Sequence, residues 1–344
     1  MSDFSWPDTL ARLVRGEDLP EHEAAAAMGE IMSGEATPGQ IGGFLVALRA
    51  KGETVDEIVG LARMMRSFSN KVSVAGPLVD TCGTGGDRAG TVNISTMSAL
   101  VVAGAGARVA KHGNRAASSE CGSADLLEAL GVAIDLDADA VARCIDEAGI
   151  GFCFAPVFHP AMRHAGPVRR ELGVPTTFNF LGPLTNPAGV SRQTIGVSDP
   201  VMAPKMAEAL AQLGCEHAFV FRGDDGLDEL TTTNTSTLWE IRGGVERRTF
   251  DPTEVGIGRS SAADLRGGSA EDNAKVATRL LDGGDGPIRD VVCLNAACAL
   301  VAAGVAGDLR EGVARSGEAI DSGRAKKTLE RFRDVSQSLK RSTL

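Results

Sequence analysis

The sequence predicts an α/β protein in which a small helical bundle precedes a larger domain with a mainly parallel central sheet. The first 70 residues contain helix signals and no strand signal. From Val72 onwards, short apolar runs alternate with longer helical patterns. That alternation is typical of a parallel sheet covered by helices. We therefore expect a helical domain over residues 1–70, joined by part of 165–190, and an α/β domain over 71–344.

Two capping boxes mark helices in the first part. Thr37 and Gln40 form one, and Thr54 and Glu57 form the other. Apolar residues follow each box at helical spacing. The pattern predicts helix, turn and helix, and the segment 67–76 that follows is the best candidate for a hinge between the two parts.

The second part predicts strands separated by helices. The strands are expected at 78–81, 108–110, 151–154, 193–197 and 217–221. The intervening helices are expected at 96–106, 123–130, 137–148, 159–172 and 201–213. Residues 238–241 and 245–250 flank two glycines and predict a hairpin. Helices are expected from Ala270 and from Arg289, and a strongly charged last helix, 324–339, is expected on the surface.

Composition excludes several classes of protein. The net charge of -10 argues against general affinity for nucleic acid or an anionic membrane. The apolar runs are too short to span a bilayer. The N-terminus has neither a basic start nor an apolar stretch, so we expect no export signal and a cytoplasmic protein. The seven cysteines are irregularly spaced, which predicts reduced thiols.

A glycine turn directly follows the first predicted strand. Gly83, Gly85 and Gly86 allow main-chain N–H groups to approach phosphate oxygens, at the sheet edge where α/β proteins bind ligands. The turn matches neither a P-loop nor a dinucleotide fingerprint, so a simple tight turn is the alternative. Asp87 is suited to a sugar hydroxyl or a metal-bound water.

Two further polar groups follow at short intervals. Asn93, Ser95 and Thr96 precede an apolar run, where a helix N-terminus favours negative charge, although an ordinary N-cap is the alternative. Lys111 and Arg115 follow the next strand and favour an anion site over solvated surface charge. The hydroxyls that follow, whose alternative is ordinary capping, are Ser118, Ser119 and Ser123.

Asp228 and Glu229 are adjacent carboxylates without a nearby lysine or arginine in the sequence. Beside a diphosphate, such oxygen ligands suit Mg²⁺, whereas alone they are more often solvated. Arg169 lies on the predicted helix 159–172, where it can grip a carboxylate or form a surface ion pair. No zinc-ligand spacing occurs among the five histidines.

Several motifs occur together in one order along the chain. These are residues 83–87, 93–96, 111–115, 158–162, 181–187 and 228–230. In this set the sequence closely resembles the anthranilate phosphoribosyltransferase family. The resemblance implies a class III phosphoribosyltransferase architecture, related to nucleoside phosphorylases, usually assembled as a homodimer through the helical domains. One departure is Arg88, where the family often has glycine.

The resemblance also implies site residues. Phosphoribosyl pyrophosphate (PRPP) would contact Gly83, Gly85, Gly86, Asp87, Thr91, Asn93, Ile94, Ser95, Thr96, Lys111, His112, Gly113, Asn114, Arg115, Ala116, Ala117, Ser118, Ser119 and Ser123. Anthranilate would contact Gly83, Asn114, Arg169, His112, His159 and Met162. Two Mg²⁺ ions would be held by Ser95, Asp228 and Glu229. The residues implied in catalysis are Lys111, Asp228, Glu229 and Arg169.

The implied reaction is displacement of pyrophosphate from ribose C1 by the amine of anthranilate, a step of tryptophan biosynthesis. Two rival functions remain at this stage: a pyrimidine nucleoside phosphorylase, and a non-catalytic binding protein on the same scaffold. The first would not be expected to carry the acidic pair, and the second would be expected to lose the glycine turn. Association with anthranilate synthase is left open.

Overall fold

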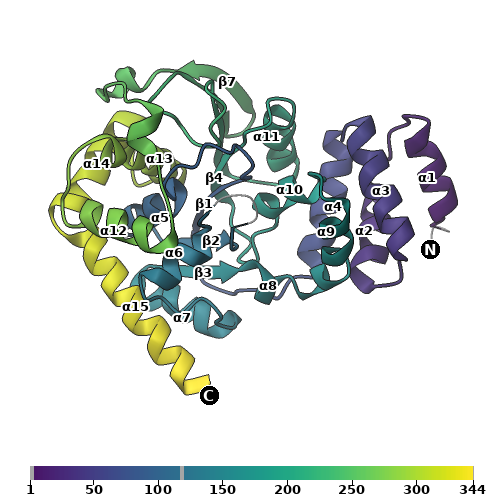
Figure 1. The fold of residues 1–344 in the computed structure, drawn as a ribbon, viewed down its shortest axis with the longest axis horizontal. Coiled ribbons are helices and arrows are strands. Elements are labelled where there is room, and N and C mark those ends of the chain that lie inside the picture. Colours follow the sequence, from purple (N-terminus) through teal and green to yellow (C-terminus); the bar gives the residue numbers. More distant parts are fainter. Residues whose placement is uncertain (1–3, 117–119, 344) are drawn as a thin grey trace.

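The helical part of the chain is as the sequence predicts. The structure is a computed structural model that describes residues 4–116 and 120–343 (Figure 1). The first helices are α1 (Trp6–Val14), α2 (Glu21–Ser33), α3 (Pro38–Lys51) and α4 (Val55–Ser67). Both capping boxes form, because the Thr37 and Thr54 side chains each accept a hydrogen bond from the third helical residue. Helix α2 packs against α4, and α1 packs against α3.

Over the described residues, the sheet has seven strands in the order β3-β2-β1-β4-β5-β6-β7. The parallel strands are β1 (Val79–Gly83), β2 (Val109–Gly113), β3 (Ile150–Phe154), β4 (Arg192–Gly196) and β5 (His217–Gly223). The predicted hairpin forms β6 (Ser236–Ile241) and β7 (Val245–Phe250), which run antiparallel. The strand order reverses between β1 and β4, and α/β sheets bind ligands at such a switch point.

Two apolar clusters cover the two faces of the sheet. One contains Val109 and Phe219 together with residues of α5 (Ile94–Gly104), α6 (Ser123–Ala129), α7 (Ala138–Ala148), α12 (Ala270–Leu281), α13 (Pro287–Ala303), α14 (Leu309–Asp321) and α15 (Arg324–Thr343). The other contains Cys82 and Ile195 with α11 (Met202–Gln212), and it continues into the helical bundle. The bundle therefore joins this side of the larger domain through α11, against which α4 packs.

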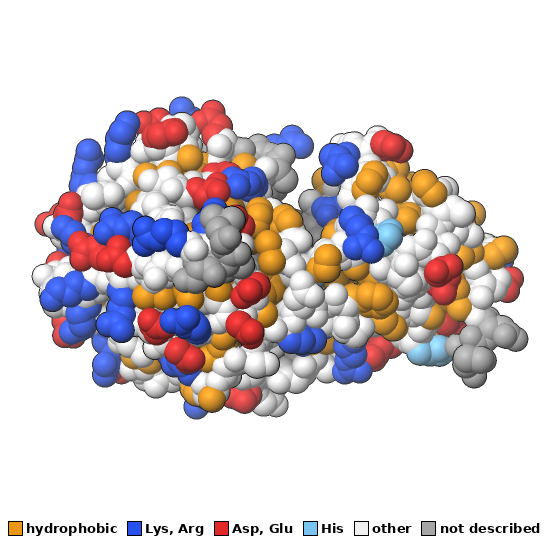
Figure 2. Space-filling model, turned by 90° about the horizontal axis from the view of Figure 1, so that it is seen from below, with side chains coloured by type: hydrophobic (Ala, Val, Ile, Leu, Met, Phe, Trp, Pro, Cys, Tyr) orange, Lys and Arg blue, Asp and Glu red, His pale blue; other side chains and the backbone are white. Residues whose placement is uncertain are grey.

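The surface carries charge of both signs. On the face shown in Figure 2, acidic and basic side chains are interspersed over the larger lobe. None of the helices in the described ranges combines the length and apolar character needed to cross a membrane.

Two sequence expectations need correction. The segment 159–172 is not one helix but follows α8 (Ala155–Phe158) as η1 (Pro160–Arg163) and α9 (Gly166–Leu172). Pro160 and Pro167 each lie at the start of a helical segment, because proline has no N–H to donate to a preceding turn. The second strand does not end at residue 110 but continues to Gly113. It includes two buried polar residues, Lys111 and His112. The predicted last helix is confirmed as α15, which lies at the surface, is amphipathic and packs against α5 and α7.

Some elements were not expected from the sequence. They are α10 (Phe178–Leu181), η2 (Gly182–Thr185), η3 (Pro252–Val255), η4 (Ala262–Leu265) and the longer α14. The short ones have too few turns to show a helical period. Helix α9 and the η1 turn pack against α3 and α2, so this later part of the chain lies beside the bundle (Figure 1).

Candidate active site

The glycine turn and the acidic pair meet at the carboxyl ends of β1 and β4. Gly83 and Gly196 are paired at the ends of these two strands. A Cβ atom on Gly196 would lie 1.5 Å from the Asp228 carbonyl oxygen, and one on Gly83 would lie 2.3 Å from Asp228 Oδ2. The loop between β5 and β6 therefore rests directly on these glycines. The two regions, whose bonded residues Gly85 and Asp228 are 143 positions apart in the sequence, lie together at the switch point.

Hydrogen bonds hold the glycine turn in place. Gly85 N–H donates to Asp228 Oδ2 at 2.7 Å, and Thr84 N–H donates to the Gly196 carbonyl at 2.9 Å. Gly85 and Gly86 have φ values of 68° and 85°, which only glycine adopts readily. Arg88 has φ 56° and is the one non-glycine residue with positive φ in the described ranges. The turn thus has left-handed backbone conformations at its glycines and also at Arg88.

The acidic pair is costly to ionise without a cation. Glu229 is buried, and its Oε1 accepts a hydrogen bond of 3.0 Å from the Ser95 N–H at the start of α5. Burial and the neighbouring Asp87 raise the pKa of Asp228 to about 7. Burial and Asp228 raise the pKa of Glu229 well above its usual value, against the opposing attraction of Lys111. A divalent cation beside both carboxylates would relieve this cost.

The protein side chains alone do not complete a metal site. In the part of the chain that the structure describes, no group of three or more His, Cys, Asp or Glu residues is placed to hold a metal ion. Mg²⁺ commonly uses one or two carboxylates and completes its shell with water and substrate phosphates. The acidic pair therefore fits a cation that arrives with a diphosphate.

Lys111 lies within β2 and not in the loop that follows it, which corrects the sequence expectation. Its side chain is 2% exposed, and Nζ donates to the Thr81 carbonyl at 2.6 Å. Burial lowers its pKa, whereas the attraction of Asp80 raises it. A buried ammonium near Glu229 contributes positive charge from beneath the site.

The loop after β2 contains the other predicted phosphate contacts. Arg115 is exposed and pairs with Asp125 and Glu128. Ser123 Oγ donates to the Asn114 carbonyl at 3.2 Å, and a Cβ atom on Gly113 would lie 2.2 Å from that hydroxyl. Ala116 is described at the end of this loop, whereas Ala117, Ser118 and Ser119 lie outside the described residues.

Ser95 and Thr96 lie inside α5 and are not its N-cap, contrary to the capping alternative. Asn93 occupies the cap position without a capping side-chain bond, because its Oδ1 accepts instead from Asn273 Nδ2 at 2.8 Å. Ile94 is buried as the first helical residue. Thr96 Oγ1 is buried and has no hydrogen-bond partner among the described residues. Thr91 pairs with Arg266 in an isolated bridge at the far end of the glycine loop.

Two buried histidines lie together beside η2. The rings of His112 and His159 are 5.0 Å apart. His112 Nδ1 lies 3.1 Å from the Gly182 carbonyl, and the Thr185 carbonyl is hydrogen-bonded to His159. Burial lowers the pKa of His112 to about 3 and that of His159 to about 4, so both are neutral at pH 7. Their buried Nε2 atoms have no partner within the described ranges.

Arg169 presents a cation on α9, which packs against η1, the turn that contains the half-buried Met162. Its guanidinium lies 5.2 Å from the centre of the Phe178 ring, and burial lowers its pKa. No carboxylate of the described residues forms a salt bridge with it, so the surface ion pair considered from the sequence is not seen. A cation held on an aromatic face is available to a planar carboxylate.

Several supporting residues were missed from the sequence. Gly196 is one, because nothing in the sequence shows what it faces. Asn295 is another: its side chain bonds both the N–H and the carbonyl of Leu230 at 2.9 Å, next to the acidic pair. A single asparagine within the apolar run of α13 was the available signal. Asp80 and Asn186, both buried, are further examples.

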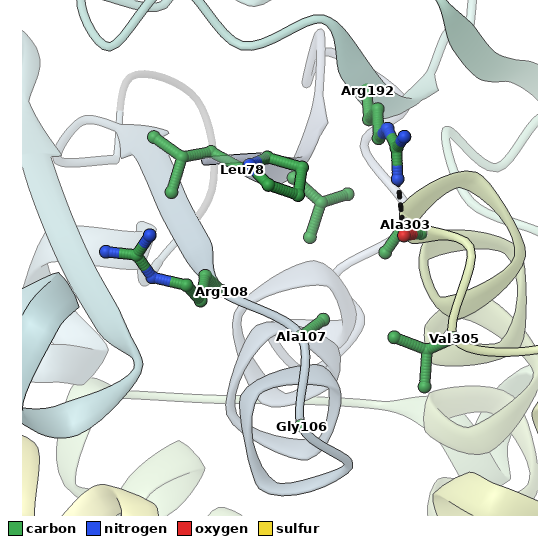
Figure 3. Close-up of a pocket in the computed structure, with 9 residues that line it drawn as sticks. Leu78, Gly106, Ala107, Arg108, Arg192, Ala303 and Val305 are labelled. Carbon is green, nitrogen blue, oxygen red and sulfur yellow. Dashed lines mark hydrogen bonds between the residues drawn. The ribbon is translucent and has the colours of Figure 1, made fainter. Parts of the chain in front are cut away.

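A separate hollow lies at the opposite edge of the sheet (Figure 3). Its volume is about 150 Å³, and it is lined by residues at the amino ends of β1, β2 and β4, including Leu78, Arg108 and Arg192. Arg192 donates to the Ala303 carbonyl at 2.6 Å across it. None of the predicted site residues lines this hollow, so it is distinct from the candidate active site.

Comparisons with known proteins agree with this geometry. The profile of the glycosyl transferase family, a/b domain, matches residues 75–326, and that of the helical bundle domain of the same family matches 7–69. An anthranilate phosphoribosyltransferase from Nocardioides is 58% identical over 334 residues, covering 95% of this chain and 98% of the relative.

Solved structures give the same result. The crystal structure of anthranilate phosphoribosyltransferase from Thermus thermophilus has a TM-score of 0.91 and 47% identity, over 96% of this chain and 99% of that one. The Saccharomyces cerevisiae enzyme in complex with PRPP and Mg has a TM-score of 0.90 and 28% identity, over 98% and 99% of the two chains. The chain belongs to the anthranilate phosphoribosyltransferase family.

Proposed function

We propose that the enzyme transfers the phosphoribosyl group of PRPP to the amine of anthranilate, releasing pyrophosphate, as a step of tryptophan biosynthesis. The observation that carries this proposal is the contact between the glycine turn and the acidic pair, through Gly85 and Asp228. This contact brings main-chain N–H groups and carboxylates that can bind a cation into one site. The relatives that share this fold carry that name, and the yeast structure holds PRPP and Mg.

The donor half of the site stabilises the leaving diphosphate. The N–H groups of Gly85 and Ser95, which here donate to Asp228 and Glu229, would turn to phosphate oxygens when PRPP binds and the carboxylates hold Mg²⁺. Two Mg²⁺ ions held by Asp228, Glu229 and Ser95 would neutralise charge that develops on the pyrophosphate. Lys111 adds positive charge from within β2. Loss of the diphosphate leaves a ribose centre that resembles an oxocarbenium ion, which the amine attacks.

The acceptor half orients anthranilate. Arg169 grips the carboxylate of anthranilate, and Asn114 and Gly83 define the near side of its site. His112 and His159 are neutral and present unprotonated Nε2 atoms, which can accept hydrogen bonds from an amine. An aromatic amine already has a lone pair, so the reaction needs no strong general base.

We propose the following organisation for the enzyme. Residues 1–70 with part of 165–190 form the helical domain, and 71–344 form the domain that binds PRPP. The packing of α9 against α3 supports that division. A cytoplasmic homodimer is proposed from the family resemblance, and association with anthranilate synthase is a separate hypothesis that co-purification tests.

The test is a fluorescence assay of anthranilate consumption, with PRPP and Mg²⁺ each added or omitted. The proposal expects consumption only when both are present, with one pyrophosphate released for each anthranilate consumed. Thymidine with inorganic phosphate serves as the control for nucleoside phosphorylase activity. Phosphorolysis of thymidine without anthranilate consumption would contradict the proposal.

A further inference from the structure

A buried carboxylate outside the proposed catalytic set is connected to both histidines of the acceptor side. Asp80 lies on β1 and is 0% exposed. Its Oδ1 accepts a hydrogen bond of 3.1 Å from the main-chain N–H of His112, and its Oδ2 accepts one of 2.8 Å from Asn186 Nδ2. Removing a carboxylate from water costs free energy, so the hydrogen-bond partners that offset this cost indicate what the carboxylate does.

Asn186 is fully engaged in one orientation. Its Nδ2 donates to Asp80 and also to the Ala110 carbonyl at 2.8 Å, whereas its Oδ1 accepts from the Ala188 N–H at 2.9 Å. Turning the amide over would place its oxygen against the two acceptors and its NH₂ against the Ala188 N–H. The asparagine is therefore locked, and it ties its own segment to β1 and β2.

That segment, residues 182–187, is here called the connector segment. Its successive carbonyls accept hydrogen bonds from separate elements: Gly182 from His112 Nδ1, Pro183 from Gln193 Nε2 at 2.7 Å, Leu184 from Arg66 Nε at 2.7 Å, Thr185 from His159, and Pro187 from the Val72 N–H at 3.2 Å. The connector segment joins the end of the bundle, the sheet and both histidine rings.

The geometry explains how both imidazoles keep one tautomer. His112 Nδ1 lies 3.1 Å from the Gly182 carbonyl, and the Thr185 carbonyl is a hydrogen-bond partner of His159. Donation from an Nδ1–H to each of these carbonyls would leave each Nε2 as an acceptor. The two Nε2 atoms are buried without a partner in the described residues, and the rings are 5.0 Å apart. Asp80 holds the main chain of His112 directly, and through Asn186 it holds the carbonyls that orient the two rings.

We propose that Asp80, acting through Asn186, is a positioning residue that orients His112 and His159 toward the amine of the acceptor. The proposal rests on the proposed function for the identity of the acceptor. It assigns to these buried groups a role in acceptor binding in addition to any role in folding.

The primary test is Asp80→Asn. An amide offers one acceptor oxygen where the carboxylate offers two, so either the His112 N–H or Asn186 Nδ2 loses its acceptor. The KM for anthranilate should rise about tenfold or more, and the KM for PRPP, which Asp80 affects only through its attraction for Lys111, should rise by a smaller factor. Tenfold corresponds to about 1.4 kcal/mol.

Exchange of the pair provides the rescue. In Asp80→Asn with Asn186→Asp, the amide at position 80 can accept from the His112 N–H and donate to the carboxylate at position 186. The anthranilate KM should return most of the way toward the wild-type value, although Ala110 loses its donor. Should Asp80→Asn fail to fold, Asn186→Ala tests the same connection and leaves the bond from the His112 N–H in place.

Glu57→Gln is the matched control. Glu57 is also a fully buried carboxylate, and it accepts from the Leu19 N–H at 2.9 Å and the Thr54 N–H at 2.7 Å, but it lies in the bundle on α4. The Glu57→Gln variant should have a lower melting temperature, and the ratio of its anthranilate KM to its PRPP KM should equal that of the wild type.

A spectroscopic readout separates this proposal from the proposed function. In enzyme labelled with ¹⁵N-histidine, the ring nitrogens of His112 and His159 should show the Nδ1–H tautomer in the wild type and a shifted or mixed signal in Asp80→Asn. Unchanged ring signals, or equal changes in both KM values, would overturn the positioning role. An inactive wild type would refute the proposed function, and the ring signals would still test the connection.

Discussion

Substitution of Gly196 by alanine tests the contact on which the site depends. Gly196 ends β4 opposite Gly83, and an added Cβ atom would lie 1.5 Å from the Asp228 carbonyl oxygen and 2.4 Å from its carbonyl carbon. Ordinary contact begins near 3.4 Å. The obstacle is main chain and cannot rotate away, so the Asp228 backbone has to retreat by about 2 Å.

The expected loss follows from that displacement. A misplacement of 1 Å at a reacting centre costs about 10²-fold in rate. We therefore expect Gly196→Ala to lower kcat/KM by about 100-fold or more. Overpacking of this kind costs about 1–3 kcal/mol of stability, so the melting temperature should fall while the enzyme remains folded.

The assay is steady-state turnover of anthranilate at saturating Mg²⁺, with the melting temperature measured on the same sample. Gly258→Ala is the control, because no atom lies within 4 Å of its added Cβ atom. That variant should behave as the wild type. A folded Gly196→Ala enzyme with wild-type kcat/KM would refute the argument that the Asp228 main chain must rest on β4.

The remaining predictions address the acidic pair, the acceptor and pH. Asp228→Ala with Glu229→Ala should lower turnover by orders of magnitude, and rates restored by excess Mg²⁺ would contradict the metal role. Arg169→Ala should raise the anthranilate KM far more than the PRPP KM, with the exposed Arg170→Ala as control; equal rises would indicate a general defect. Mg²⁺ binds the ionised carboxylate, and the pKa of Asp228 is about 7, so protonation should weaken Mg²⁺ binding below pH 7. The Mg²⁺ concentration at half-maximal rate should fall about tenfold from pH 6 to pH 8 in kinetic titrations, and a rise would contradict this assignment.

The elements that depend on local chemistry were predictable. The capping boxes at Thr37 and Thr54 form as expected, because each depends on residues three positions apart. The glycine turn was predictable because the positive φ of Gly85 and Gly86 is a property of those residues themselves. The prediction of a single helix over 159–172 was wrong, because it gave a periodic apolar pattern more weight than the two prolines that divide the segment.

Burial of polar groups was not predictable in the same way. Lys111 was expected to follow a strand, since a lysine is almost never fully buried unless it is paired. Its partners, Thr81 and Asp80, come from a neighbouring strand some 30 positions earlier in the chain. Only the sheet brings them within reach.

By itself, the sequence determined which chemistry the chain carries: main-chain donors in a glycine turn, a carboxylate pair and a few basic side chains. Those properties belong to individual residues and their near neighbours. Tertiary structure alone decided that Asp228 rests on Gly83 and Gly196, and that Asp80 and Asn186 hold the two histidines. Such contacts join residues far apart along the chain, and their distances exist only once the sheet has set the register of its strands.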